Sequence, residues 1–258
     1  MLPFWLSIGV LSLVQAALVA APKAPTTRLL QRLQSKWWAL VLPLSIVVVI
    51  SAIALDSASA RFLTYLALVA VPPLAAVALA WLIYGSRAWL ALLSIPLFSL
   101  AWAAEGSLSG ETAALALSAL ACVTLGWLVA SVVPSRWLKL GIYAMAAIDA
   151  YLVFSNLLQE PNSVLNAAAP AADLPRLQLG SFGSAVMGFG DLFVAATLGA
   201  LLASDRRLQL QGAVLAALIC PAWNLLFFFV DQTPATVPIA LTLAALEFLR
   251  RRSKGSQR

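Results

Sequence analysis

Long apolar runs, each about the length that crosses a membrane, follow one another along this chain and are separated by short polar connections. A helix needs roughly 20 apolar residues to cross a hydrocarbon core of about 30 Å. The runs are continuously apolar and do not alternate with polar residues, so the pattern predicts helices. Nine spans are predicted, over residues 3–21, 37–55, 62–83, 89–104, 112–133, 137–158, 184–203, 210–230 and 234–249.

The composition of the chain fits a membrane protein and excludes an ordinary soluble domain. Hydrophobic residues make up 62% of the chain and charged residues 10%, and the mean hydropathy is +0.95. A soluble domain carries about 25% charged residues, so this chain has too few for a water-facing surface. We therefore expect one all-α, polytopic domain surrounded by the lipid bilayer, in which backbone groups pair within each helix.

The basic residues are distributed unequally when the connections between spans are assigned to alternate sides of the membrane. Only Arg61 and Arg176 share a side with the N-terminus. An excess of Lys and Arg marks the cytoplasmic side, which predicts an outside N-terminus, a cytoplasmic C-terminus and a prokaryotic plasma membrane. The other fourteen basic residues are Lys23, Arg28, Arg32, Lys36, Arg87, Arg136, Lys139, Arg206, Arg207, Arg250, Arg251, Arg252, Lys254 and Arg258.

The positions of the basic residues bear on two further questions, whether the first span is cleaved and whether the chain binds nucleic acid. No Lys or Arg precedes the first span, which predicts that this span is retained and not cleaved as a signal peptide. The basic residues are also not interleaved with aromatic residues on a soluble face, so no nucleic-acid partner is expected.

The residue types that are missing exclude several kinds of chemistry. The chain has no histidine, which removes Ser-His and Cys-His catalysis and leaves no expected zinc or haem site. Its two cysteines, Cys122 and Cys220, lie far apart inside apolar spans. Their spacing fits neither a metal site nor a redox pair, so we interpret them as small buried hydrophobic residues and expect no cofactor and no metal.

Two acidic residues lie inside predicted spans, where a charged side chain is costly and marks a functional hypothesis. They are Asp149 in the sixth span and Asp191 in the seventh. The other acidic residues fall in connections or at span ends. Glu247, for example, lies one turn before the basic run of Arg250, Arg251 and Arg252, where it is expected to pair or to reach the interface.

The two aspartates have matching depths in the predicted topology. Asp149 precedes Leu158, the outer end of its span, by nine residues, and Asp191 follows Ser184, the outer start of the next, by seven. At 1.5 Å per residue, both lie on the order of 10–14 Å below the outer face. Two neighbouring antiparallel helices thus each bring one carboxyl group to a similar level.

Such a carboxyl pair supports two kinds of chemistry. Two carboxyl groups a few ångströms apart share one proton, so one accepts a proton from water while the other polarises a peptide carbonyl. Because the titration belongs to the pair, neither residue receives a separate acid or base role. Gly188 and Gly190 remove side chains beside Asp191 and are expected to let a substrate backbone approach. Two intramembrane acids equally serve proton or cation transport.

The order of motifs resembles that of the presenilin and signal peptide peptidase family of intramembrane aspartyl proteases. Asp149 in the sixth span is followed in the seventh by Gly188-Phe189-Gly190-Asp191, matching the family's Gly-x-Gly-Asp motif. The family's residue before the first aspartate is tyrosine, whereas this chain has Ile148, and Tyr151 does not occupy the same place.

The family's Pro-Ala-Leu motif, which opens its ninth span, has a partial counterpart. The ninth span here opens with Pro234-Ala235-Thr236, followed by Pro238, so threonine replaces leucine. A competing pair, Pro221-Ala222, lies inside the eighth span and is interpreted as a helix kink. Bacterial prepilin peptidases also use Gly-x-Gly-Asp, but they lack a Pro-Ala-Leu counterpart and typically carry a lysine soon after the motif.

The resemblance implies a fold, an activity and a substrate class. It implies nine spans, with residues 1–136 as a five-helix scaffold and residues 137–258 as the catalytic helices. Asp149 and Asp191 would be catalytic, and Pro234, Ala235, Thr236 and Pro238 would contact substrate. The predicted orientation is that of signal peptide peptidases, so substrates would be transmembrane peptides such as signal-peptide remnants or type II membrane proteins.

The connection between the two aspartate-bearing spans, residues 159–183, is expected to be mostly a flexible external loop. Its end, at residues 177–179, and residues 185–187 are expected to become extended, because the family pairs an unwound substrate strand beside the catalytic aspartate. Pro234 and Pro238 are expected to leave free carbonyl acceptors near the site.

Overall fold

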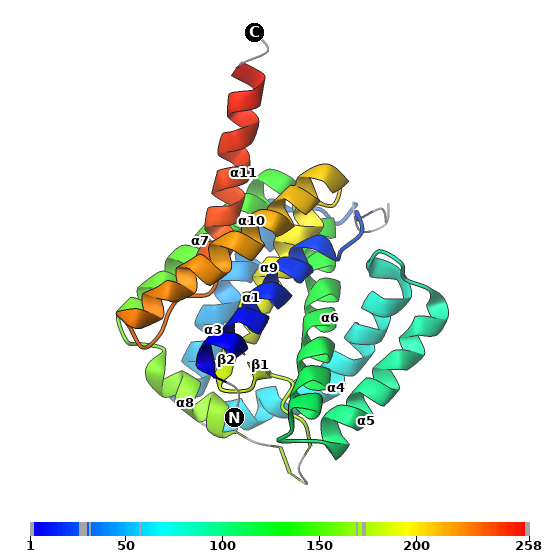
Figure 1. Ribbon diagram of the computed structural model, residues 1–258, viewed down its shortest axis with the longest axis vertical. Helices are drawn as coiled ribbons and strands as arrows, with labels where there is room; N and C mark the ends of the chain where they lie inside the picture. Colours follow the sequence, from blue (N-terminus) through cyan, green and yellow to red (C-terminus); the bar gives the residue numbers. More distant parts are fainter. Residues whose placement is uncertain are drawn as a thin grey trace.

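The computed structural model describes residues 3–25, 30, 32–56, 58–168, 170–171 and 174–255, and these residues form a mostly helical bundle (Figure 1). Each of the nine predicted spans contains a helix. The first five are α1 (Phe4–Ala20), η1 (Lys36–Leu40) with α3 (Val41–Leu55), α4 (Ala58–Val77) with η2 (Ala78–Leu82), η3 (Ala88–Leu93) with α5 (Ser94–Ala103), and α6 (Leu108–Val132). The last four are α7 (Ser135–Phe154), α9 (Phe189–Leu202), α10 (Arg206–Asn224) with η4 (Leu225–Phe228), and α11 (Val237–Gly255).

Five helical segments within the described residues are long and apolar enough to cross a membrane. They have 20 to 25 residues and comprise residues 36–55, 58–82, 108–132, 135–154 and 206–228. The segments 4–20, 88–103 and 189–202 are apolar but shorter. Helix α11 has 19 residues and ends in the basic run, which lowers its hydropathy. The structure is therefore consistent with a membrane protein.

Several helices begin where the sequence provides a capping side chain. The Ser107 hydroxyl accepts from the Gly110 N–H at 3.2 Å before α6, and the Asp205 carboxylate accepts from the Leu208 N–H at 3.1 Å before α10. These contacts satisfy N–H groups that have no partner within the helix. Pro221 lies inside α10, as expected.

The structure departs from the all-α prediction between α7 and α9. Residues 159–183 were predicted to be mostly a flexible loop, and this prediction was wrong, because they contain helix α8 (Gln159–Ala167) and strand β1 (Leu179–Phe182). Helix α8 lies at the end of the bundle where the N-terminus lies (Figure 1). Strand β1 pairs antiparallel with β2 (Ala185–Gly188), with Leu179 opposite Gly188 and Phe182 opposite Ala185.

The hairpin also shortens the predicted seventh helix. That helix was expected to begin at Ser184 but begins at Phe189, because residues 185–188 form β2. The extended conformation expected at residues 185–187 is confirmed, as it is at Leu179. The tight turn of the hairpin contains Gly183 at φ 59, and the Gly183 N–H donates to the Glu111 carboxylate at 2.7 Å.

Helix α9 lies in the middle of the bundle and packs against α1, α6, α7, α10 and α11 (Figure 1). Two glycines allow its closest approaches. A Cβ at Gly126 of α6 would lie 2.7 Å from the Thr197 backbone nitrogen, and a Cβ at Gly199 would lie 2.5 Å from the Leu18 carbonyl oxygen of α1. Small residues thus bring backbone against backbone, as is common between membrane helices.

Three connections that carry basic residues contact one another at one end of the bundle. The Lys23 ammonium donates to the Ser86 hydroxyl, and the Arg206 guanidinium lies 3.8 Å from the centre of the Tyr84 ring. At the opposite end, Ser7 contacts Ser184 near the hairpin. Of the fourteen basic residues predicted on one side, Arg28 and Arg258 lie outside the described residues.

Candidate active site

Asp149 lies in the last third of α7 and is 5% exposed. Its carboxylate oxygen Oδ2 accepts a hydrogen bond from the Thr236 hydroxyl at 2.5 Å. The Thr236 backbone N–H points to the same oxygen at 3.4 Å. Both contacts join residues that are 87 positions apart in the sequence. Thr236 immediately precedes α11 and is fully buried. The residue that departs from the family's Pro-Ala-Leu motif is therefore the direct partner of the first aspartate.

Asp191 is the third residue of α9 and is partly exposed. Its Oδ2 accepts at 3.0 Å from the backbone N–H of Gly188, the residue that caps the helix. A carboxylate in the first turn that accepts from the capping residue satisfies one of the unpaired N–H groups there. The strand β2 ends at Gly188, so the hairpin and the aspartate are joined through this contact.

Asp149 and Asp191 lie on helices that pack against each other, α7 and α9. Their pairing as two neighbouring carboxyl groups stays a prediction. Gly190 lies beside α7 as well, since a Cβ there would be 3.5 Å from the Met145 methyl group, one turn before Asp149. The two carboxyl groups have different donors: Asp191 is held by the nearby Gly188, and Asp149 by the distant Thr236.

The glycines of the motif have contacts within the chain itself. A Cβ at Gly188 would lie 3.0 Å from Asp191 Oδ2, the oxygen that its own N–H contacts. Gly188 thus leaves room for the carboxylate to reach its N–H. Gly190 has more space, and Phe189 is half-buried, its carbonyl oxygen 3.7 Å from the Cys122 sulfur. Substrate access remains a prediction for both glycines.

The Pro234-Ala235-Thr236 segment is fixed by hydrogen bonds, and the expectation of free carbonyl acceptors there was wrong. The Pro234 carbonyl accepts from the Val237 N–H at 3.4 Å, and the Thr236 carbonyl accepts from the Ala240 N–H at 3.1 Å. The Ala235 carbonyl accepts from the Gln15 side chain of α1 at 3.1 Å. Each carbonyl therefore already has an internal donor. Pro238 is buried in the first turn of α11.

Helix α1 supports the site through polar residues that the sequence reasoning missed. Besides Gln15, the Ser12 hydroxyl accepts from the buried Asn224 amide of α10 at 2.7 Å. The Ser7 hydroxyl accepts from the Ser184 backbone N–H at 3.2 Å, at the turn between β1 and β2. A glutamine in the middle of an apolar span is itself a functional signal by the rule applied to the aspartates, and Gln15 was overlooked.

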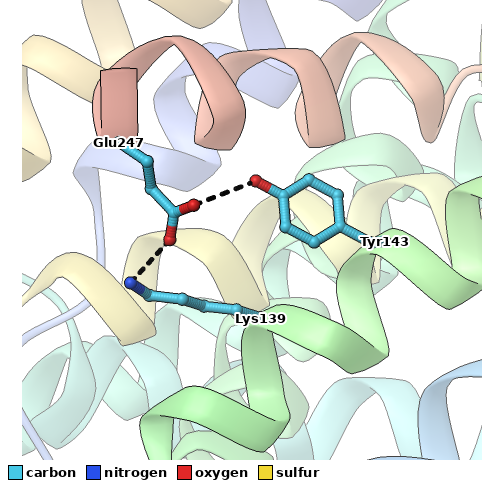
Figure 2. Close-up of polar contacts among 3 residues, drawn as sticks. All are labelled: Lys139, Tyr143 and Glu247. Atoms are coloured by element: carbon cyan, nitrogen blue, oxygen red, sulfur yellow. Dashed lines mark hydrogen bonds and ion pairs between the residues drawn. The ribbon is translucent and has the colours of Figure 1, made fainter. Parts of the chain in front are cut away.

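Glu247 forms an ion pair, as expected, but its partner lies in α7 and not in its own helix. Its carboxylate lies 2.7 Å from the Lys139 ammonium of α7 and accepts from the Tyr143 hydroxyl at 3.5 Å (Figure 2). The residues that flank it in sequence had been the expected partners. Together with the Thr236–Asp149 contact, this cluster joins α7 to α11 at two levels.

The remaining candidates from the sequence are the two cysteines, Tyr151 and any metal-ligand group. Both cysteines are free and buried, as expected. Tyr151 is 65% exposed, so it does not replace the tyrosine that the family has at the place of Ile148. No group of three or more Cys, Asp or Glu that suits a metal ion occurs among the described residues.

The arrangement places two carboxyl groups with different hydrogen-bond donors on helices that pack against each other, and a close carboxyl pair is able to share one proton. Comparison of the chain with family models, with curated proteins and with solved structures finds no match.

Proposed function

We propose that this protein is an intramembrane aspartyl protease of the presenilin and signal peptide peptidase type. The observation that carries the proposal is the convergence of three separated segments on one site. Helices α7 with Asp149, α9 with Asp191, and α11 pack against one another, and the Thr236 hydroxyl before α11 donates to Asp149. These segments carry the first aspartate, the Gly-x-Gly-Asp motif and the Pro-Ala-Leu counterpart of the family. Their convergence supports hydrolysis, because the reaction needs both carboxyl groups at one place.

The proposed chemistry is hydrolysis of a peptide bond by water. One carboxylate accepts a proton from water as its oxygen attacks the carbonyl carbon, and the other, protonated carboxyl group donates to the carbonyl oxygen. The carbon–nitrogen bond then breaks as the nitrogen receives the first proton, and the second carboxylate recovers its own. The pair returns to its starting state, and no metal or cofactor takes part.

The hairpin supports a role in holding substrate. Strand β2 ends three residues before Asp191, and Val186 within it is 53% exposed. A transmembrane peptide must unwind before its backbone reaches the aspartates, and its unpaired N–H and C=O groups then need partners. Addition of the unwound segment to an edge of the hairpin provides these partners beside the catalytic pair.

The proposal includes nine membrane-crossing segments, an outside N-terminus and a cytoplasmic C-terminus. Support comes from the meeting of the basic connections at one end of the bundle and of the hairpin with the start of α1 at the other. In this orientation the site faces the outer half of the bilayer of a prokaryotic plasma membrane. The substrates are transmembrane peptides such as signal-peptide remnants or type II membrane proteins.

The experiment is cleavage of a model type II transmembrane substrate by the purified protein in liposomes, followed by mass spectrometry of the products. We expect cleavage within the apolar segment, and we expect Asp149→Asn and Asp191→Asn each to abolish it. Cleavage that survives either substitution contradicts the aspartyl mechanism. If the wild-type protein conducts protons or cations and leaves the substrate intact, the transport alternative replaces the proposal.

A further inference from the structure

The surroundings of the two aspartates are alike in two respects. Each carboxylate lies at the start of a helix, Asp191 at that of α9 and Asp149 at that of α11. Each also has one backbone N–H directed at its Oδ2, from Gly188 at 3.0 Å and from Thr236 at 3.4 Å. A helix start and an N–H donor both favour the ionised form of a carboxyl group. These two features are shared and therefore do not distinguish Asp149 from Asp191.

The difference between them is a hydroxyl group. The Thr236 Oγ1 lies 2.5 Å from Asp149 Oδ2, the distance of a charge-assisted O–H···O⁻ hydrogen bond. The backbone N–H of the same residue also donates to Oδ2, so this oxygen accepts from both polar groups of Thr236. Asp149 is buried, and in low-dielectric surroundings such a bond is worth more than in water.

We propose that Thr236 is a positioning residue that holds Asp149 as the ionised member of the pair, so that Asp149 takes the proton from water and Asp191 supplies the proton. This inference rests on the proposed protease function and gives the two aspartates separate roles. The Thr236 contact engages Oδ2 of Asp149 and leaves Oδ1 to receive the proton. Since the family has leucine at this position, the hydroxyl contact belongs to this chain.

The proton movements follow from this assignment. As the water oxygen forms its bond to the scissile carbonyl carbon, a water proton passes to Asp149 Oδ1, and the Asp191 proton passes to the carbonyl oxygen. When the carbon–nitrogen bond breaks, Asp149 gives its proton to the leaving nitrogen, and Asp191 regains its proton from the new carboxyl group. Thr236 donates throughout and is not consumed.

The position of Thr236 is fixed from both sides. The preceding residue, Ala235, is held through its carbonyl by Gln15 of α1, and the Thr236 carbonyl accepts from Ala240 within α11. Further along, Glu247 of α11 pairs with Lys139 of α7 (Figure 2). This ion pair joins α11 to α7, the helix that carries Asp149. The Thr236 hydroxyl, which precedes α11, is therefore held in position relative to Asp149.

The test compares Thr236→Val, which has the same shape without the hydroxyl, with Thr236→Ser, which retains the hydroxyl. Cleavage of the model substrate in liposomes gives kcat and KM for both variants and for the wild type. We expect Thr236→Val to lower kcat roughly 10- to 100-fold, as loss of a hydrogen bond to a charged group does, with KM changed less than about 2-fold. Thr236→Ser is expected to stay within about 3-fold of wild type.

Two results overturn the inference. One is an equal loss of kcat in Thr236→Val and Thr236→Ser, and the other is a Thr236→Val effect on KM with kcat retained. Thr236→Ala takes the place of Thr236→Val under the same criteria if the valine variant does not fold. Failure of the proposed function is distinct, because the wild type would then not cleave, or would cleave without Asp149 and Asp191.

Discussion

The Gly188 N–H donates to Asp191 Oδ2 at 3.0 Å, and a Cβ on Gly188 would lie at the same distance from that oxygen. A methyl group there is in closer contact than packed atoms normally allow, so the Asp191 carboxyl group must move. We expect Gly188→Ala to lower cleavage of the model substrate by roughly 10-fold or more, since small displacements of a catalytic group have large effects. The thermal unfolding midpoint should change little.

A comparison within the same motif makes this prediction specific. A Cβ on Gly190 would lie 3.5 Å from the flexible end of Met145, which is ordinary contact. Gly190→Ala is therefore expected to cause a smaller loss than Gly188→Ala. The opposite order would show that access beside Gly190, and not the geometry of Asp191, limits the activity.

Gln15 provides a second prediction, far from the aspartates in sequence. In Gln15→Leu the Ala235 carbonyl loses its donor inside the bundle, which costs about 1–3 kcal/mol for a buried polar group. We expect a lower thermal unfolding midpoint in detergent together with reduced cleavage, because the segment that holds Thr236 is no longer fixed. Leu13→Ala, at a position 58% exposed on the same helix, is the control and should retain both properties.

Much of the fold follows from the sequence because apolar runs of this length have one stable form in a bilayer. Helices such as α6 and α7 were predicted within a few residues. The hairpin was predicted only in part, because Ala185-Val186-Met187-Gly188 is as apolar as the helix that follows it. Hydrophobicity does not separate a short buried strand from the first turn of a helix.

The site was predictable in its aspartates but not in its hydrogen bonds. Asp149 and Asp191 are charged residues inside apolar spans, which is a signal visible in one sequence. The Thr236 hydroxyl was treated only as a departure from a motif, because its partner lies 87 residues away in sequence. Contacts such as those of Gln15 and Ser12 depend on how helices pack, and no local pattern specifies them.

Helix packing around α9 gives a third prediction. A Cβ at Gly126 or Gly199 would meet backbone atoms of the neighbouring helix at 2.7 and 2.5 Å, and a backbone cannot rotate away as a side chain does. Gly126→Ala and Gly199→Ala are expected to destabilise the protein by about 1–3 kcal/mol or more, as overpacking does. Steric trapping or thermal unfolding in detergent measures this loss. Gly9→Ala, with nothing within 4 Å of the added atom, should be neutral.

The ion pair between α7 and α11 gives a fourth prediction. Lys139 and Glu247 are 35% and 29% exposed, so the pair is partly screened and worth about 0.2–1 kcal/mol. We expect Lys139→Glu to lower the unfolding midpoint modestly, and the double variant Lys139→Glu with Glu247→Lys to recover most of the loss. Additivity of the two single reversals, without recovery, would mean that the pair contributes no coupling energy.

The polar contacts of α1 also have a consequence for biogenesis. Helix α1 is synthesised before α9, α10 and α11, yet Ser7, Ser12 and Gln15 have partners at Ser184, Asn224 and Ala235, which follow it in the chain. Until α10 and the segment that opens α11 have been inserted, Ser12 and Gln15 lack those partners. Helix α1 therefore completes its polar contacts only after the segment that opens α11 has been synthesised, and ribosome-stalled chains that end before Ala235 should contain an Asp149 that lacks its Thr236 contact.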